Sequence, residues 1–118
     1  MTKETSLSDI QLQIRKFCDE RNWDQFHNPK DLAISLNLEA SELLEHFQWK
    51  NETEILHYLE SHRDNIAEEI SDVLYWTLLI ANKFEINLVK AFEQKMLQNE
   101  HKYPVDKSHS SAKKYTEL

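Results

Sequence analysis

Glycine is absent from this chain of 118 residues, although average usage of roughly 7% would give about eight. Phosphate-binding loops of the Walker and Rossmann types need glycine where the backbone approaches a phosphate. Tight β-hairpin turns also depend on glycine, so a hairpin-rich β fold is disfavoured. A helical protein suffers least, because glycine weakens a helix interior by roughly 1 kcal/mol relative to alanine. Any phosphate chemistry must therefore use side chains and metal ions.

Cysteine, basic charge and long apolar runs are also scarce. Cys18 is the single cysteine, so no internal disulfide can form and a reducing compartment is favoured. The net charge of −7 argues against general nucleic-acid binding, which usually needs a basic patch. No apolar run approaches the ~20 residues of a transmembrane helix, and the N-terminal stretch lacks the apolar core of a signal peptide. We expect a cytoplasmic protein without a nucleic-acid or membrane partner.

The sequence does contain apolar residues at helical spacing, in segments that are separated by residues typical of helix caps. The apolar spacing predicts helices that end near residues 21, 49, 60, 84 and 102. The expected N-cap of the first helix is Ser6 or Ser8, and that of the second is Asn28, followed by Pro29. Thr53 is expected to cap a short third helix, and Asn87 the last one. The fourth helix is expected to start near residue 63. The predicted fold is an all-α bundle of four to five helices. Residues 1–104 form the domain, and residues 105–118, rich in Ser and Lys, form a flexible tail.

Two pairs of acidic residues lie within apolar helix faces. At 100° per residue, Glu39 falls within about 60° of the leucine stripe of the second helix, and Glu42 lies at its edge. On the long helix, Glu69 falls within about 60° of the apolar stripe, and Asp72 lies about 60° to its other side. Residues three apart on a helix are neighbours. If the two stripes pack together, four carboxylates converge.

Buried negative charges that lack a partner would cost many kcal/mol. A hard divalent cation suits oxygen ligands, and magnesium commonly completes its shell with water and substrate phosphates. The alternative is that each pair is an ordinary solvated helix face. The repetition of the pair on two long helices favours the metal site.

The tryptophans offer flat surfaces on which a nucleobase could stack. Trp76 lies one turn beyond Asp72 on the same face, although its position alone favours a role in the core. Trp49 lies at the end of the second helix, and Trp23 lies in the loop before that helix. For both tryptophans, a role in the core and a role in a base pocket are equally supported. His27 in the same loop is either a local hydrogen-bonding group or a contact to base or phosphate.

The last helix presents Lys95 and Asn99 on one face. Such a face ordinarily serves solubility. Its functional interpretation is a contact with phosphate or sugar.

These segments, taken in order, resemble the MazG-like nucleotide pyrophosphohydrolases, and within them the single-domain dCTP pyrophosphatase branch. The matching segments are residues 21–27, Glu39-x-x-Glu42 followed by Phe47-Gln-Trp49, residues 68–73, and residues 95–104. Each motif is weak alone, but their order and spacing are specific. The resemblance covers about residues 8–104 and a Lys-Lys-Tyr tail.

The resemblance implies Mg²⁺-dependent hydrolysis, with Mn²⁺ as a substitute. The substrate would be a (deoxy)nucleoside triphosphate, dCTP or a modified pyrimidine dNTP, cleaved to the monophosphate and pyrophosphate to clean the nucleotide pool. It implies a homodimer or homotetramer with composite pockets. The metal ligands and catalytic residues would be Glu39, Glu42, Glu69 and Asp72. The substrate-binding residues would be Trp23, His27, Trp49, Trp76, Lys95 and Asn99.

Two departures leave the preferred base open: Leu38 stands where many relatives carry a further Glu, and Ser41 where the dCTP branch often carries Gly. The main alternative is a non-catalytic nucleotide-binding or protein-interaction helical module. A di-iron bundle is disfavoured because only Glu54-Ile-Leu-His57 provides the Glu-x-x-His motif. An HD-type phosphohydrolase is disfavoured because no His precedes an Asp.

Overall fold

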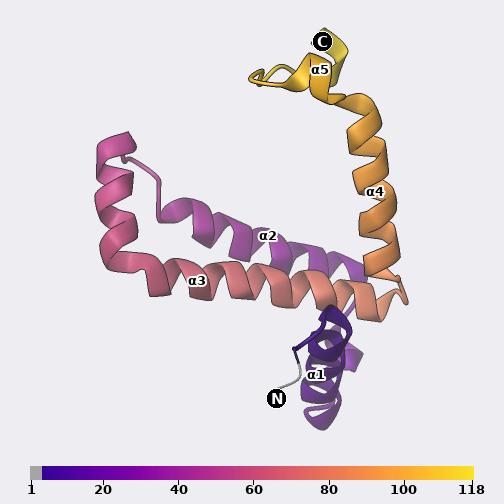
Figure 1. Cartoon of the computed structure of the whole chain (residues 1–118). Helices are drawn as coiled ribbons and strands as arrows, with labels where there is room; N and C mark the ends of the chain where they lie inside the picture. Colours follow the sequence, from indigo (N-terminus) through magenta and orange to yellow (C-terminus); the bar gives the residue numbers. More distant parts are fainter. Residues whose placement is uncertain (1–3) are drawn as a thin grey trace. The chain divides into compact units, whose positions relative to one another are not determined.

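The computed structural model describes residues 4–118 as two compact units, one ending at Glu85 and one spanning Ile86–Leu118 (Figure 1). Every regular element in residues 4–118 is helical, which confirms the predicted all-α class. The elements are α1 (Leu7–Glu20), a 3₁₀ turn (Asp24–Phe26), α2 (Pro29–Glu45), α3 (Glu52–Lys83), α4 (Leu88–Lys102), α5 (Val105–Ser108) and a second 3₁₀ turn (Tyr115–Glu117). None of these helices combines the length and apolar character that crossing a bilayer requires.

Side-chain caps fix where the helices begin. The Ser6 hydroxyl accepts a hydrogen bond from the Asp9 backbone N–H at 3.1 Å, and the Asp9 carboxylate accepts from the Ser6 N–H at 2.9 Å, which completes a capping box. Asn28 caps α2 with Pro29 at the first helical position, and Asn87 caps α4. These three predicted starts are confirmed.

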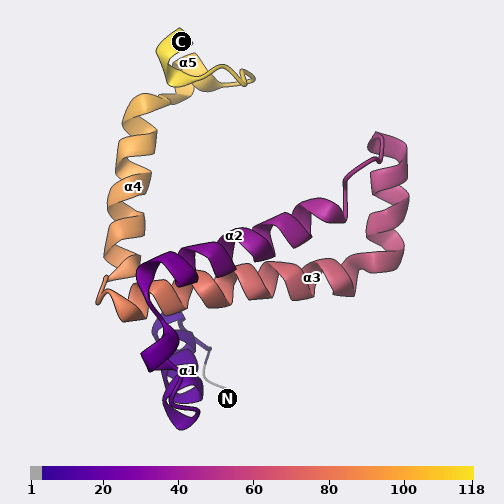
Figure 2. The same cartoon turned by 180° about the vertical axis from the view of Figure 1, so that it is seen from behind.

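The third and fourth predicted helices are joined in one element, α3, that bends at His62 (φ −123°, ψ 22°) (Figure 2). The Ser61 hydroxyl donates to backbone carbonyls of the preceding turn, a contact that often bends a helix. The predicted cap Thr53 is wrong. Asn51 caps α3 instead, because it forms a capping box with Glu54 that Thr53 has no matching acid to make.

The chain uses left-handed backbone at helix ends without glycine. Helix α2 ends at Glu45, four residues before the predicted end, and is followed by turns that finish at Trp49 with φ 69°. Asn22 (φ 54°) and Glu85 (φ 55°) hold the same region after α1 and α3. A residue with a Cβ pays roughly 1–2 kcal/mol there, although Asn tolerates it better. These helix ends therefore carry a conformational cost.

The core of the first unit lies where α2 and α3 run side by side in opposite directions, with α1 packed against α3 (Figures 1 and 2). Leu32 of α2 and Leu78 of α3 are fully buried. The Asn82 amide donates to the Gln11 backbone carbonyl at 2.9 Å, which ties α1 to the end of α3. The remaining buried apolar residues are Ile14, Cys18, Ile66, Leu79 and Ala81.

In the second unit, α4 is followed by segments that the sequence did not predict to be helical. The Tyr103 and Tyr115 rings meet edge to face at 5.8 Å, and the Lys102 ammonium lies 4.8 Å from the Tyr115 ring centroid. Residues 105–118 thus contain short helical segments. The flexibility of this tail stays a prediction.

Candidate metal centre and nucleotide site

Carboxylates from α2 and α3 converge midway along the helix pair. One oxygen each from Glu39, Glu69 and Asp72 lies within 4.8 Å of the others. Glu39 and Glu69 are half-buried, while Asp72 is exposed. Glu42 is exposed one turn beyond Glu39 and influences the ionisation of both buried acids. The structure thus brings together three of the four carboxylates that were predicted to converge, and Glu42 lies beside them.

Electrostatic repulsion dominates this cluster. Burial raises the pKa of Glu39 to about 7; a hydrogen bond to Glu42 and the negative charges of Asp72, Glu42 and Glu69 add to the shift. Burial likewise raises the pKa of Glu69, again with a contribution from Glu42. None of the ion pairs formed within residues 4–118 involves these four acids. Among the residues that the structure describes, no ion pair therefore offsets the negative charge of this cluster.

Two oxygens of the cluster are left without partners. Oε2 of Glu39 and Oε2 of Glu69 are buried and make no hydrogen bond with any group in residues 4–118. Buried polar atoms are normally satisfied, and an unpaired carboxylate oxygen is costly. A hard divalent cation would satisfy both oxygens and neutralise the repulsion. The residues present therefore fit such an ion.

Aromatic rings lie towards one end of the same helix pair. Trp76, seven residues beyond Glu69 on α3, meets the His27 ring edge to face with centroids 6.3 Å apart. Trp23 is 40% exposed in the loop before α2 and packs edge to face on Phe17 at 5.5 Å. Three predicted base-pocket residues thus gather near the start of α2.

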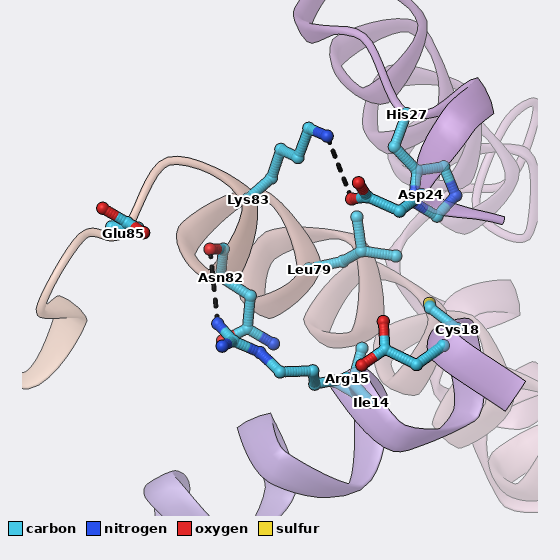
Figure 3. A pocket seen from close by; sticks show the side chains of 10 residues that line it. Ile14, Arg15, Cys18, Asp24, His27, Leu79, Asn82, Lys83 and Glu85 are labelled. Atoms are coloured by element: carbon cyan, nitrogen blue, oxygen red, sulfur yellow. Dashed lines mark hydrogen bonds and ion pairs between the residues drawn. The ribbon is translucent and has the colours of Figure 1, made fainter. Parts of the chain in front are cut away.

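The loop that carries Trp23 and His27 is held by an ion pair (Figure 3). The Lys83 ammonium lies 2.9 Å from the Asp24 carboxylate, and this contact lowers the pKa of Asp24. Both residues line a cavity of about 300 Å³ together with His27 and Arg15. Sequence reasoning missed this pair, because no local pattern links two residues on different elements.

Trp49 lies apart from the aromatic residues near the start of α2, and two further predicted site residues belong to the second unit. Trp49 lies at the opposite end of α2 from His27 and is 90% exposed. Lys95, which is exposed, and Asn99 belong to α4 in the second unit. Their contact with phosphate or sugar stays a prediction.

A second group near the carboxylates was missed by the sequence argument. His46, one turn beyond Glu42, hydrogen-bonds through Nδ1 to the Tyr58 hydroxyl. These two residues line a cavity of about 400 Å³ together with Glu42, Glu45 and Glu69. The four-residue spacing between Glu42 and His46 was the available signal, since such residues share a helix face.

Comparison with known proteins gives the class of this chain. Residues 34–118 match the sequence model of the MazG-like family. The dCTP pyrophosphatase 1 of Mus musculus is 40% identical over 117 residues, which cover 98% of this chain and 69% of that protein. The Homo sapiens dCTP pyrophosphatase 1 gives the same identity and coverage. The crystal structure of a pyrophosphatase from Archaeoglobus fulgidus has a TM-score of 0.79 and 38% identity, covering 88% of this chain and 97% of that one. This chain belongs to the MazG-like family.

Proposed function

We propose that this protein hydrolyses a deoxynucleoside triphosphate, dCTP or a modified pyrimidine dNTP, to the monophosphate and pyrophosphate. One observation carries the proposal: carboxylates of α2 and α3 converge, and two of their buried oxygens lack partners. The names of the relatives at 40% identity support the reaction and the base. Removal of unwanted nucleotides from the cytoplasmic pool is the corresponding role.

The proposed cofactor is Mg²⁺, with Mn²⁺ as a substitute, held by Glu39, Glu69 and Asp72 with Glu42 beside them. When bound, the ion supplies charge neutralisation for the phosphates and lowers the pKa of a coordinated water. The raised pKa of Glu39 belongs to the metal-free cluster, and a bound cation would lower it by stabilising the carboxylate. Glu39 or Glu42 is the candidate for orienting the attacking water and accepting its proton.

The nucleoside would bind at the aromatic end of the helix pair. Trp76 and Trp23 offer ring surfaces, and stacking contributes roughly 1–3 kcal/mol per base. His27 lies against Trp76 and offers a ring nitrogen for hydrogen bonding. Lys95 and Asn99 of α4 are proposed to contact phosphate and sugar, as the family resemblance implies.

We also propose a homodimer or homotetramer in which Trp49 of one copy closes the base pocket of another. The support is the 90% exposure of Trp49 and the exposure of large apolar side chains on α2 and α3. They include Leu38, Leu44, Ile70 and Leu74. Mixing inactive Trp49→Ala and Glu69→Gln proteins should restore activity, because some sites in the mixed oligomer receive both native residues. Failure to complement would contradict the shared pocket.

The test of the reaction is pyrophosphate release from a panel of dNTPs with Mg²⁺, with identification of the monophosphate. Glu69→Gln should lose at least about 100-fold in kcat/KM, a loss typical of removing one electrostatic contact to a transition state. Glu68→Gln, which changes an exposed neighbour, should leave the rate unchanged. Full activity in Glu69→Gln would refute the site. Calorimetric binding of a non-hydrolysable dNTP without turnover would instead favour the binding module.

A further inference from the structure

The His46–Tyr58 pair is built as a rigid unit beside the carboxylates. Tyr58 is hydrogen-bonded to His46 through its hydroxyl. The His62 ring stacks on Tyr58 with centroids 4.0 Å apart and planes within 2°. The Lys50 ammonium lies over the Tyr58 ring, 4.4 Å from its centroid. These contacts restrict the rotation of the Tyr58 side chain, so its hydroxyl holds the His46 ring in one orientation.

One ring nitrogen of His46 remains available for a ligand. Nδ1 is engaged with Tyr58, and Nε2 makes no hydrogen bond with any group in the part of the chain that the structure describes. When the Tyr58 hydroxyl donates to Nδ1, Nε2 carries the ring proton and can donate it to an oxygen. Because His46 lines the cavity that also contains Glu42 and Glu69, such an oxygen would belong to a molecule bound beside the carboxylates.

The order of groups along α2 and α3 indicates which part of a nucleotide would lie there. Helix rise places Trp76 about 10 Å from Glu69 in one direction and His46 about 6 Å from Glu42 in the other. A nucleoside triphosphate is linear, with the base at one end and the β- and γ-phosphates at the other. A base at Trp76 and an α-phosphate near the carboxylates therefore direct the terminal phosphates towards His46.

We propose that His46, oriented by Tyr58, is a phosphate-binding residue that donates a hydrogen bond to the pyrophosphate half of the substrate. This inference rests on the proposed function. The cavity walls also hold the carboxylates of Glu42, Glu45 and Glu69, so an uncomplexed phosphate would be repelled. The ligand is accordingly pyrophosphate in complex with a divalent ion, and the Lys50 ammonium beside Tyr58 adds favourable charge.

The experiment compares inhibition of dCTP hydrolysis by the two products, magnesium pyrophosphate and dCMP, in the full-length protein. His46→Leu should weaken inhibition by pyrophosphate about tenfold, the loss typical of a hydrogen bond to a charged group. The inhibition constant of dCMP for the His46→Leu variant should stay within about twofold of the native value, because the nucleoside binds at the Trp76 end of the helix pair. His57→Leu is the matched control, since His57 is exposed on α3 and outside the cavity. It should change neither constant.

Tyr58→Phe provides a second variant that keeps the stacked ring and removes only the hydroxyl. It should weaken pyrophosphate inhibition by a smaller factor and leave dCMP inhibition unchanged, and it decides the matter if His46→Leu fails to fold. Unchanged pyrophosphate inhibition in the folded variants would overturn the proposal, as would equal weakening for both products. Absence of pyrophosphate release by the unmodified protein from every dNTP would show that the proposed function itself has failed.

Discussion

The middle of the α2–α3 pair and its two ends are constructed differently. In the middle, helical periodicity places Glu39, Glu69 and Asp72 on the facing sides of α2 and α3, and the packing of these two helices brings them together. At the ends, Trp23, His27 and Trp49 lie in loops and turns outside the helices. The position of the loop that carries Trp23 and His27 depends on a contact between distant residues, Asp24 and Lys83. The middle concentrates charge at a cost in stability, whereas the ends shape a surface for the ligand. Substitutions in the two regions should therefore have different signatures.

The largest expected effect belongs to the middle. Glu39→Gln should lower kcat/KM for the preferred dNTP by at least about 100-fold and, without metal, raise the melting temperature, because it removes one charge from a repulsive cluster. Glu68→Gln, which changes an exposed residue of α3 outside the cavity that Glu42 and Glu69 line, should change neither quantity appreciably. Steady-state kinetics and thermal melts in a chelator test this. A variant that loses activity and also melts lower would show that the charge is not a source of strain.

The same cluster predicts a pH dependence of stability. The folded-state pKa of Glu39, about 7, lies above its ordinary 4.5, and that of Glu69 is raised too. The contribution of Glu39 to folding stability is therefore complete below pH 4.5 and lost as the pH rises through 7, and that of Glu69 falls in the same direction.

Thermal melts of the metal-free protein should show a falling melting temperature across this interval. Saturating Mg²⁺ should reduce the fall, because bound metal stabilises the ionised cluster. Glu39→Gln serves as the control with a flatter profile. A melting temperature that rises from pH 5 to pH 8 would contradict the assignment.

At the aromatic end, Lys83→Met should act on binding more than on chemistry. It removes the 2.9 Å contact that holds the loop of Trp23 and His27. We expect KM for dCTP to rise several-fold while kcat changes by less than about twofold, the pattern of lost uniform binding. Lys16→Met, on an exposed face of α1, should leave both unchanged. A fall in kcat at constant KM would assign Lys83 to the chemical step, and the middle and the ends of the helix pair would then not differ in the way proposed.

The smallest effect concerns the end of α3 at Glu85, which lines the cavity of Asp24 and Lys83 but has no proposed contact with the substrate. Glu85 has φ 55°, so Glu85→Gly should stabilise the fold by about 0.5–1 kcal/mol through relief of left-handed strain. Glu60→Gly in the interior of α3 should instead destabilise by about 1 kcal/mol. Urea denaturation compares the two, and activity should not change in either. Equal destabilisation by both substitutions would show that the left-handed residue carries no strain.

The helices and the acidic centre could be predicted because their determinants are local. Ser6, Asn28 and Asn87 cap helices through hydrogen bonds to residues three positions away. Spacing on a helical wheel was sufficient to place Glu39 and Glu69 on facing stripes.

Features that depend on distant contacts or on competition between neighbours could not be predicted in this way. Asn51 caps α3 in place of Thr53 because its partner Glu54 lies at the right spacing. The pairing of His46 with Tyr58 depends on the turn between α2 and α3. Helical periodicity in the sequence does not predict the path of that turn. The early end of α2 likewise comes from a series of backbone turns that continues to Trp49, which has φ 69°.

The orphaned oxygens of Glu39 and Glu69 have a consequence for the life of the protein in a cell. An ion that binds only the folded chain protects it in proportion to its free concentration. Proteases that capture briefly opened molecules respond to the population of the open form. We therefore expect the half-life of this chain to follow the supply of divalent cations, so that shortage of the ion removes the enzyme as well as silencing it.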